Sequence, residues 1–298
     1  MSNQNSSVIS VNDLVVTLHG DDGNDRDVHY GSFEIYPGDF VLIKGRNGSG
    51  KSTFLRLFHL QGIDYFTVKS GEIRFNCEDI NGVAFPKPHK HKDETDAQDE
   101  KSSRNSIHQY SSEDKSRLNR TIAFIGQEER FRSNDSAQSY IHEACRIALG
   151  DLPVAQRNRK LREADEMIHE YYEKYLAKSF ECKNYKTFKN KNAHAWSGGQ
   201  QKMINVLEGV IKARICGAKL VLMDEPLNNL DGKNKDILNK LITELRSCNV
   251  AIVTITHCQI FDGVNKVLLL SEKEDGTRCA KLLERAEPAH VECLEAYN

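Results

Sequence analysis

The chain has 298 residues, of which 28% are charged and 39% hydrophobic, and its formal net charge is -2. This composition is typical of a globular protein, and the near-zero charge excludes bulk electrostatic attraction to nucleic acid or lipid. The 8 cysteines form no C-x-x-C pair or other zinc spacing, which favours reduced thiols over a disulfide framework.

The first elements predicted along the chain are β-strands. Residues 8–18 partly alternate apolar and polar side chains, and a turn-rich loop follows from His19 to Asp25. Ser32–Tyr36 alternates as well, and a Pro-Gly-Asp turn separates it from the apolar run Phe40–Ile43. A short continuous apolar run of this kind is typical of a buried strand, so we expect the chain to enter a core here.

A phosphate-binding pattern comes directly after this strand. It reads Gly45-Arg46-Asn47-Gly48-Ser49-Gly50-Lys51-Ser52, which matches G-x-x-x-x-G-K-[ST], and a helical pattern begins at Thr53. Glycines let the backbone wrap an anion, and the N–H groups at the start of the helix stabilise its charge. The pattern predicts that Lys51 reaches the β- and γ-phosphates and that Ser52 ligates Mg²⁺. The chain is therefore predicted to bind a nucleoside triphosphate.

The middle of the chain is less regular. Another short strand is expected at Glu72–Phe75, and residues 86–120 are so poor in apolar side chains that they read as a mobile polar insertion. A buried-type strand, Thr121–Ile125, then leads to Gln127. Apolar residues at three- and four-residue steps predict a helix within 153–178, and the lysines and aromatics of 183–191 fit a solvated linker better than a nucleic-acid site.

The last part alternates helices with buried strands. A long helical pattern follows Ser197-Gly198-Gly199-Gln200, and the strand Leu220–Met223 ends in Asp224-Glu225. After a helix that begins near Asp231, the strand 250–256 ends at His257, and two final strands at 267–270 and 278–283 precede a short C-terminal helix. This alternation predicts an α/β fold with a mainly parallel sheet.

The acidic pair supplies the chemistry that a phosphate loop needs beside it. A carboxylate at the carboxyl end of a parallel strand faces the ligand crevice. Asp224 is suited to the Mg²⁺ shell, and Glu225 to polarising an attacking water.

Taken together, the motifs resemble those of an ATP-binding cassette (ABC) ATPase. Such proteins carry in order a phosphate loop, a loop glutamine, an S-G-G-Q signature, an Asp-Glu strand end, an S/N-x-L-D loop and a switch histidine. The matching residues are Gly45–Ser52, Gln127, Ser197–Gln200, Asp224-Glu225, Asn228-Asn229-Leu230-Asp231 and His257. The resemblance covers nearly the whole chain outside residues 86–120.

The resemblance implies a fold and a domain organisation. The expected fold is that of phosphate-loop NTPases, with a mainly parallel core sheet, an N-terminal antiparallel β portion and an inserted α-helical subdomain. The whole chain, 1–298, is then one ABC ATPase domain, with residues 1–130 and 215–298 as the catalytic core and 131–214 as the helical subdomain that carries the signature.

It also implies the roles of the site residues. ATP and Mg²⁺ are the expected cofactors, with ATP held by Gly45–Ser52 and Thr53. The expected metal ligands are Ser52, Gln127 and Asp224, and the expected catalytic residues are Glu225, His257, Lys51 and Gln127. In this family two cassettes sandwich two ATP molecules, so Ser197–Gln200 and Asp231 are expected to face the ATP of a second, identical or different, ABC subunit.

Two departures from the family pattern stand out. The loop from His19 to Asp25 lacks the usual aromatic residue that stacks on adenine, which leaves His19 or Tyr30 as substitutes. The helix after the signature lacks the usual run of Arg and Ala and reads Gln201-Lys202-Met203-Ile204-Asn205. Neither departure affects the hydrolytic residues, so we predict an active ATPase.

The preferred function is the ATPase subunit of a membrane transporter, placed at the cytoplasmic face of a membrane by a transmembrane partner. The resemblance implies this role, because one cassette without membrane spans is the usual form of a transporter subunit. The apolar runs here are far shorter than the ~18–20 residues that cross a bilayer, so a partner would supply the spans. One alternative is a soluble ABC ATPase acting on nucleic acid or another soluble partner, although nucleic acid finds support only in the 183–191 stretch. The other alternative is a regulatory module that binds ATP without hydrolysing it. The presence of Glu225 and His257, the residues expected to act in hydrolysis, argues against it.

Overall fold

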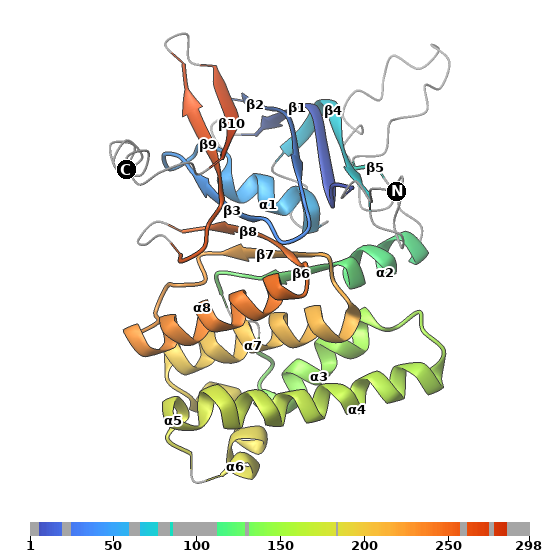
Figure 1. Cartoon of the computed structure of the whole chain (residues 1–298), viewed down its shortest axis with the longest axis vertical. Helices are drawn as coiled ribbons and strands as arrows, with labels where there is room; N and C mark the ends of the chain where they lie inside the picture. Colours follow the sequence, from blue (N-terminus) through green and yellow to red (C-terminus); the bar gives the residue numbers. More distant parts are fainter. Residues whose placement is uncertain are drawn as a thin grey trace.

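A ten-stranded sheet organises the part of the chain that the structure describes (Figure 1). The computed structural model describes residues 6–19, 25–59, 66–76, 84–85, 112–128, 131–182, 184–256, 261–273 and 277–284. Across the sheet the strands are β5 (Ala84–Phe85), β4 (Phe66–Phe75), β1 (Ile9–Leu18), β2 (Arg26–Ile35), β10 (Arg278–Glu284), β9 (Lys266–Glu272), β3 (Phe40–Lys44), β8 (Ala251–Ile255), β7 (Leu220–Asp224) and β6 (Ile122–Ile125).

The sheet has an antiparallel half and a parallel half. β1 pairs antiparallel with β2 and β4, whereas β3, β8, β7 and β6 run parallel to one another, as does β9 next to β3. β10 joins the halves, because it is antiparallel to β9 and pairs in parallel with β2 at Arg278 and Cys279. The predicted fold class, a mainly parallel core with an N-terminal antiparallel portion and a helical portion, is confirmed.

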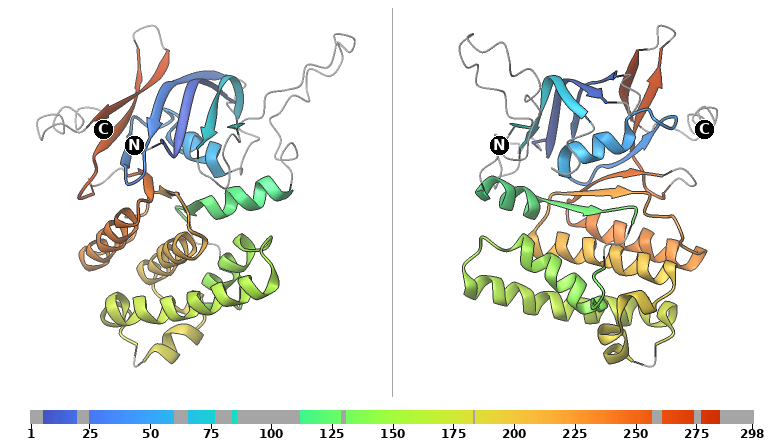
Figure 2. Two further views of the ribbon diagram at one scale, coloured as in Figure 1. Left: turned by 45° about the vertical axis from the view of Figure 1, so that its right-hand side comes forward. Right: turned by 180° about the vertical axis from the view of Figure 1, so that it is seen from behind.

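The parallel strands are buried on both faces. The helices that cover them are α1 (Lys51–His59), α7 (Gly198–Cys216) and α8 (Gly232–Ser247). In β3, Val41 packs in the core that contains α1, and its neighbour Leu42 packs in the core that contains α7 and α8. Figure 2 shows α1 and α7 on opposite sides of the strands. Burial on both faces explains the continuous apolar runs of these strands, since neither face meets water.

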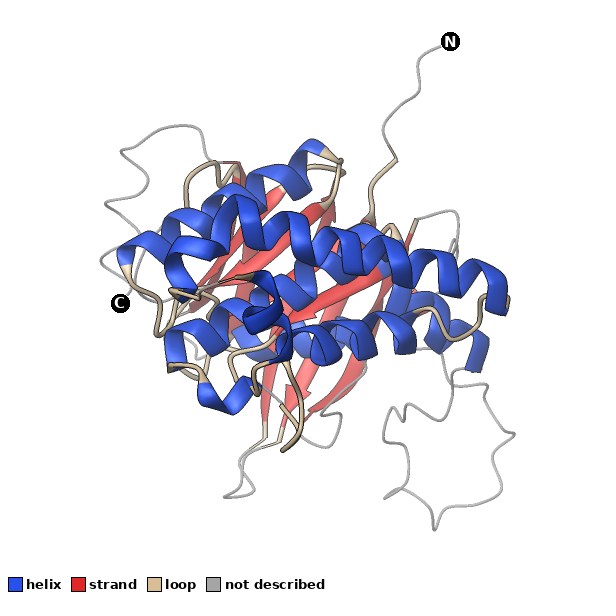
Figure 3. Cartoon of the chain, turned by 90° about the horizontal axis from the view of Figure 1, so that it is seen from below, coloured by secondary structure: helices blue, strands red, loops and turns tan. Residues whose placement is uncertain are grey.

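A second layer of helices lies beyond α7, on the side away from the sheet (Figures 1 and 3). Its members are α3 (Ala137–Ala148), α4 (Val154–Tyr171), a π-helical turn (Tyr172–Leu176), α5 (Ala177–Phe180) and α6 (Tyr185–Asn190). The helix predicted within 153–178 is therefore interrupted by the π-helical turn. α7 packs closely on β6 at Gly209. A Cβ at this position would lie 2.3 Å from Ile125 Cγ1, so the close packing requires glycine.

Residues 86–120, which the sequence predicts as a mobile polar insertion, end in a helix. Residues 86–111 lie outside the described part, but Ser112–Thr121 forms the helix α2, which runs directly into β6. One apolar residue, Leu118, is 2% exposed and anchors this helix. Arg120 forms an ion pair with Asp151. The composition of the whole segment hides this anchor, because the segment is otherwise polar.

The expectation of a solvated linker at 183–191 is wrong. Lys183 lies outside the described residues, but Tyr185–Asn190 forms α6, which Asn184 caps by accepting a hydrogen bond from Thr187 N. Phe188 is fully buried, and Tyr185 stacks on His169 with ring centroids 4.2 Å apart. Phe188 is thus inside the protein, and one face of the half-buried Tyr185 is covered by His169. The predicted C-terminal helix lies outside the described residues.

Candidate nucleotide-binding site

Three of the motifs that the sequence predicts as functional follow strands that end at one edge of the sheet. β3, β6 and β7 run parallel, and their carboxyl ends lead to Gly45, Gln127 and Asp224. Ligands of α/β sheets bind outside this edge. The neighbouring strand β8 leads to His257, which lies outside the described residues, so its predicted role stays a prediction.

The phosphate loop depends on glycine at two positions. Gly45 has φ +153 and Gly50 has φ +98, conformations that other residues rarely adopt. A Cβ would lie 2.7 Å from Leu270 O at Gly45 and 2.8 Å from the Tyr30 hydroxyl at Gly50. The backbone therefore lies where no side chain fits, as a loop that wraps an anion requires.

Lys51 lies across its own loop. Its Nζ donates to Gly45 O at 2.7 Å and to Arg46 O at 3.0 Å, and the residue is 7% exposed. Burial lowers the pKa of Lys51, whereas the charges of Glu225 and Asp224 act in the opposite direction. The acidic pair is thus close enough to act on the lysine.

The loop also holds a buried hydroxyl that suits an anion. Ser49 Oγ is buried and has no hydrogen-bond partner within the described residues. α1 begins at Lys51 and carries no acidic residue in its first turn, so its free N–H groups point toward any bound phosphate without a competing carboxylate. The glycine cradle, the buried hydroxyl and the helix start together fit the phosphates of ATP.

The acidic pair sits on a constrained turn. Asp224 ends β7, and Glu225 follows with φ +51 and only 5% of its surface exposed. Glu225 N donates to Ile255 O at 3.1 Å, which fixes the turn to β8. A left-handed conformation at a residue other than glycine costs about 1–3 kcal/mol and is concentrated at functional sites.

The predicted metal ligands are hard oxygen donors from three elements. Ser52 lies in the first turn of α1, Gln127 follows β6 and Asp224 ends β7. Across the described ranges, no group of three or more His, Cys, Asp and Glu residues is arranged to hold a metal. One carboxylate with a hydroxyl and an amide nevertheless fits Mg²⁺, which binds through few protein ligands, waters and phosphate oxygens.

The signature residues lie against a different loop. Ser197 caps α7: its Oγ accepts from Gln200 N at 3.4 Å, and Ser197 N donates to Gln200 Oε1 at 3.1 Å. A Cβ at Gly199 would be 2.9 Å from Asn229 O, so the signature and the loop before Asp231 are neighbours. Asp231 caps α8 by accepting from Asn234 N at 2.8 Å. In the described part of the chain, no hydrogen bond or ion pair joins the signature to Gly45–Ser52.

Tyr30 is buried against the phosphate loop, so its ring cannot stack on adenine. It is 1% exposed, and its hydroxyl donates to Gly50 O at 2.7 Å. The interpretation of Tyr30 as an adenine-binding residue is therefore wrong. His19 remains the other candidate; its ring nitrogens lie 3.0 Å from Asp25 Oδ2 and 2.7 Å from Thr67 Oγ1.

One contact to the loop was missed by sequence reasoning. Arg278, on β10, donates from Nη1 to Gly48 O at 2.5 Å. Arg278 Nε also pairs with Glu272 at 3.3 Å. No local signal marks this arginine, because it lies far along the chain from the loop and only the position of β10 in the sheet brings it there.

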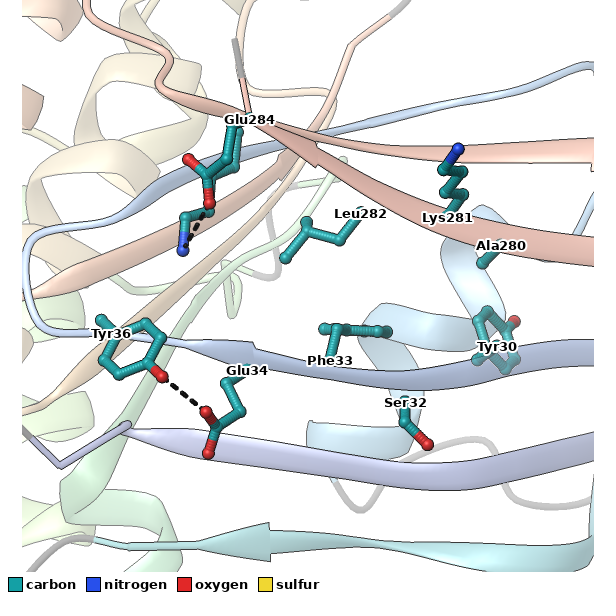
Figure 4. Close-up of a pocket in the computed structure, with 10 residues that line it drawn as sticks. Tyr30, Ser32, Phe33, Glu34, Tyr36, Ala280, Lys281, Leu282 and Glu284 are labelled. Carbon is teal, nitrogen blue, oxygen red and sulfur yellow. Dashed lines mark hydrogen bonds and ion pairs between the residues drawn. The ribbon is translucent and has the colours of Figure 1, made fainter. Parts of the chain in front are cut away.

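A separate pocket of about 470 Å³ lies between β2 and β10. Figure 4 shows Phe33 and Leu282 in the space between the two strands, with the Tyr36 hydroxyl directed at Glu34. The carboxylates of Glu34 and Glu284 line this pocket. Lys266 and Lys281 line it as well, so its charges balance, and no residue of the phosphate loop belongs to it.

The fold and the site define a class. A buried strand, a glycine loop and a helix at the carboxyl edge of a parallel sheet, with an acidic pair beside them, make up a phosphate-loop nucleoside triphosphatase. A family model described as ABC transporter matches residues 28–228, and the chain belongs to that family. The resemblance that the sequence motifs indicated is confirmed.

Curated relatives agree with this assignment. The chain is 27% identical over 249 residues to the lipoprotein-releasing system ATP-binding protein LolD of Coxiella burnetii, covering 82% of this chain and 84% of that protein. It is 26% identical over 302 residues to the spermidine/putrescine import ATP-binding protein PotA of Mycoplasmopsis synoviae, covering 87% of this chain and 63% of that protein.

Solved structures share the fold. The ATP-binding cassette MJ0796, in a dimeric post-hydrolysis state bound to ADP and Pi, matches with a TM-score of 0.60 and 18% identity, over 94% of this chain and 99% of that one. An inward-facing conformation of a putative metal-chelate type ABC transporter matches with a TM-score of 0.59 and 20% identity, over 98% and 90%.

The family assignment fixes the general activity. The chain is an ABC ATPase, the ATP-binding component that energises transport in an ABC transporter. Cassettes of this family dimerise and pair with transmembrane subunits in transporter complexes. None of the helices in the described residues is long and apolar enough to cross a membrane.

Proposed function

We propose that this chain hydrolyses Mg-ATP at a dimer interface and thereby drives a separate transmembrane subunit, to which it binds at the cytoplasmic face of a membrane. The observation that carries the proposal is the separation of its two ATP-contacting surfaces. The phosphate loop lies at the carboxyl edge of the sheet, and the signature lies against Asn229 without a hydrogen bond or ion pair to that loop among the described residues.

The phosphate loop provides one half of the site. Gly45–Ser52 and Thr53 surround the phosphates with backbone N–H groups, and the Ser49 hydroxyl gains the partner it lacks within the described residues. Lys51 gives up the carbonyls of Gly45 and Arg46 and donates to the β- and γ-phosphate oxygens. Its positive charge then neutralises charge that develops in phosphoryl transfer.

The edge of the sheet provides the hydrolytic groups. Ser52, Gln127 and Asp224 hold Mg²⁺, which supplies charge neutralisation across the phosphates when bound. Glu225, held by its bond to Ile255, polarises the attacking water, and Gln127 helps to orient that water. His257, at the end of β8, is proposed to contact the γ-phosphate.

The second half of the site comes from another cassette, identical or different. Ser197–Gln200 start α7, so their N–H groups and the Ser197 hydroxyl can bind the γ-phosphate held by that partner. Asp231 lies beside them at the start of α8. We further propose that residues 131–214 act as a helical subdomain and contact the transmembrane partner near Gln127.

The test compares wild type with Glu225→Gln and with Glu166→Gln, an exposed carboxylate on α4. Wild type and Glu166→Gln should hydrolyse ATP in Mg²⁺, alone or with the co-purified partner, and Glu225→Gln should bind ATP without turnover. Trapped with Mg-ATP, Glu225→Gln should double in mass by light scattering. Equal hydrolysis by all three proteins, or a monomer under every condition, would contradict the proposal.

The partner is tested by affinity purification from native cells, with soluble and detergent-extracted membrane fractions kept apart. Co-purification with a polytopic membrane protein supports the transporter role and identifies the transported class through that partner. Recovery only from the soluble fraction, with nucleic acid or a soluble protein, supports the alternative of a soluble ABC ATPase.

A further inference from the structure

Two polar side chains of α7 are buried beneath the loop that carries Gln127. Lys202 is 1% exposed and Asn205 is 4% exposed. Lys202 Nζ donates to Gly126 O at 2.7 Å and to Gln127 O at 2.8 Å, and Asn205 Nδ2 donates to Gly126 O at 3.1 Å. Two successive carbonyls of the loop therefore accept hydrogen bonds from one face of one helix.

A lysine in this place calls for a physical reason. α7 buries mostly apolar side chains, such as Met203, Ile204 and Val206, and Lys202 is a charged residue buried among them in the helix. Burying an ammonium group is costly unless hydrogen bonds compensate it, and charge-assisted bonds to carbonyls are stronger than neutral ones. The carbonyls of Gly126 and Gln127 supply such bonds, so a shift of the loop would break two charge-assisted hydrogen bonds of a buried ammonium group.

The contacts extend to α3. The Tyr140 hydroxyl donates to Asn205 Oδ1 at 3.3 Å, and the Tyr140 ring packs edge-on against Phe131 with centroids 4.6 Å apart. Phe131 follows Gln127 closely in the chain. The Gln127 loop is thus held both by α7 and, through Asn205, by the start of the second helical layer.

We infer that Lys202 is a positioning residue for Gln127: its ammonium fixes the loop backbone so that the Gln127 side chain is directed at the metal and water of the phosphate site. This inference rests on the proposed role of Gln127 as a Mg²⁺ ligand. Lys202 lies on α7 about half a turn after Gln200, the last residue of the signature. The position of the Gln127 loop is therefore set by α7. The same helix begins with the signature, which is proposed to bind the ATP of the second cassette.

The experiment compares Lys202→Met, which removes the donors, with Lys202→Arg, which keeps a charge, and Lys212→Met, a control on the same helix. Amide hydrogen exchange is measured by mass spectrometry without nucleotide. We expect faster exchange in the peptide that spans residues 122–131 for Lys202→Met alone, with the rest of α7 unchanged. Uniformly faster exchange along α7 would show that the lysine only fills the core and would overturn the inference.

A second readout uses the metal. At saturating ATP, the Mg²⁺ concentration for half-maximal hydrolysis should rise by about tenfold or more in Lys202→Met, the effect typical of losing a group that orients a metal ligand. ATP binding in EDTA should not change, and Lys202→Arg should restore part of the Mg²⁺ response. An unchanged Mg²⁺ response would overturn the inference.

The two hypotheses fail in different ways. If wild type shows no Mg-dependent hydrolysis, the proposed function fails, and hydrogen exchange still decides whether Lys202 holds the loop. If wild type is active and Lys202→Met matches it in both readouts, only the inference fails. Should Lys202→Met not fold, Lys202→Gln, with one remaining donor group, replaces it in the same measurements.

Discussion

Glu208 should make the protein less stable as the pH rises, and Glu208→Gln should remove this dependence. Glu208 lies on α7 and is 8% exposed. Burial raises its pKa from the ordinary 4.5 to about 7, although Lys212 acts in the opposite direction. Between these two values the unfolded chain loses the proton and the native chain keeps it, so ionisation favours the unfolded state.

The size of the effect follows from the two pKa values. Each unit corresponds to about 1.4 kcal/mol, so full ionisation in the unfolded state destabilises the protein by about 3 kcal/mol above pH 7. Little of this penalty is present below pH 4.5, where both states hold the proton. Between pH 5 and pH 8.5, the free energy of unfolding of Glu208→Gln should therefore rise relative to wild type by about 2–3 kcal/mol.

Urea unfolding at pH 5, 6, 7 and 8.5 measures this difference, with fluorescence of the single tryptophan and circular dichroism as probes. The control is Glu143→Gln, a half-buried residue on α3. Its pKa is lowered by its hydrogen bond to Arg146, and its loss should matter little. If the curves of wild type and Glu208→Gln stay parallel across this pH range, burial does not hold the proton on Glu208 and the reasoning is wrong.

Two further predictions concern the loop and the core. Gly50→Ala should lose most of its affinity for a fluorescent ATP analogue, because its Cβ would lie 2.8 Å from the Tyr30 hydroxyl at φ +98; Gly48→Ala, with open space at φ +75, should lose less. Lys266→Met should lower the free energy of unfolding by about 3–5 kcal/mol in urea, because it leaves Asp39, 2.9 Å from Lys266 Nζ, buried without that cation. Adding Asp39→Asn should recover part of this loss, and no recovery would contradict the explanation.

The parallel part of the fold could be predicted because its signals are local. Each strand is a continuous apolar run that can be recognised from its own residues. Because the strands run parallel, their carboxyl ends lie at the same edge of the sheet, and so do the motifs that follow them. The sequence therefore predicts the phosphate loop and the Asp224-Glu225 pair at one edge of the sheet. In the structure the strands that precede them, β3 and β7, both lie parallel to β8, which is between them. The interaction of the loop with the acidic pair is visible in the pKa of Lys51, on which both carboxylates act.

Elements with few apolar residues could not be predicted in the same way. α2 depends on the burial of Leu118, and α6 on that of Phe188, so neither shows a helical stripe in the sequence. The same limit applies to the supports of the site. Tyr30, Arg278 and Lys202 reach the phosphate and Gln127 loops from distant positions in the chain, and only the assembled sheet brings them together.

These distant supports share one physical feature that bears on function: each donates a hydrogen bond to a backbone carbonyl of a loop. Tyr30 bonds to Gly50, Arg278 to Gly48 and Lys202 to Gln127. Donors to carbonyls fix the loop backbone and leave its N–H groups and side chains available for phosphate and metal. A loop fixed in this way is already ordered before ATP binds. Less of the binding free energy is therefore used to order the loop. The carbonyl of Gln127 adds a second consequence. Its hydrogen bond to Lys202 links the loop proposed to ligate Mg²⁺ to the helix that opens with the signature.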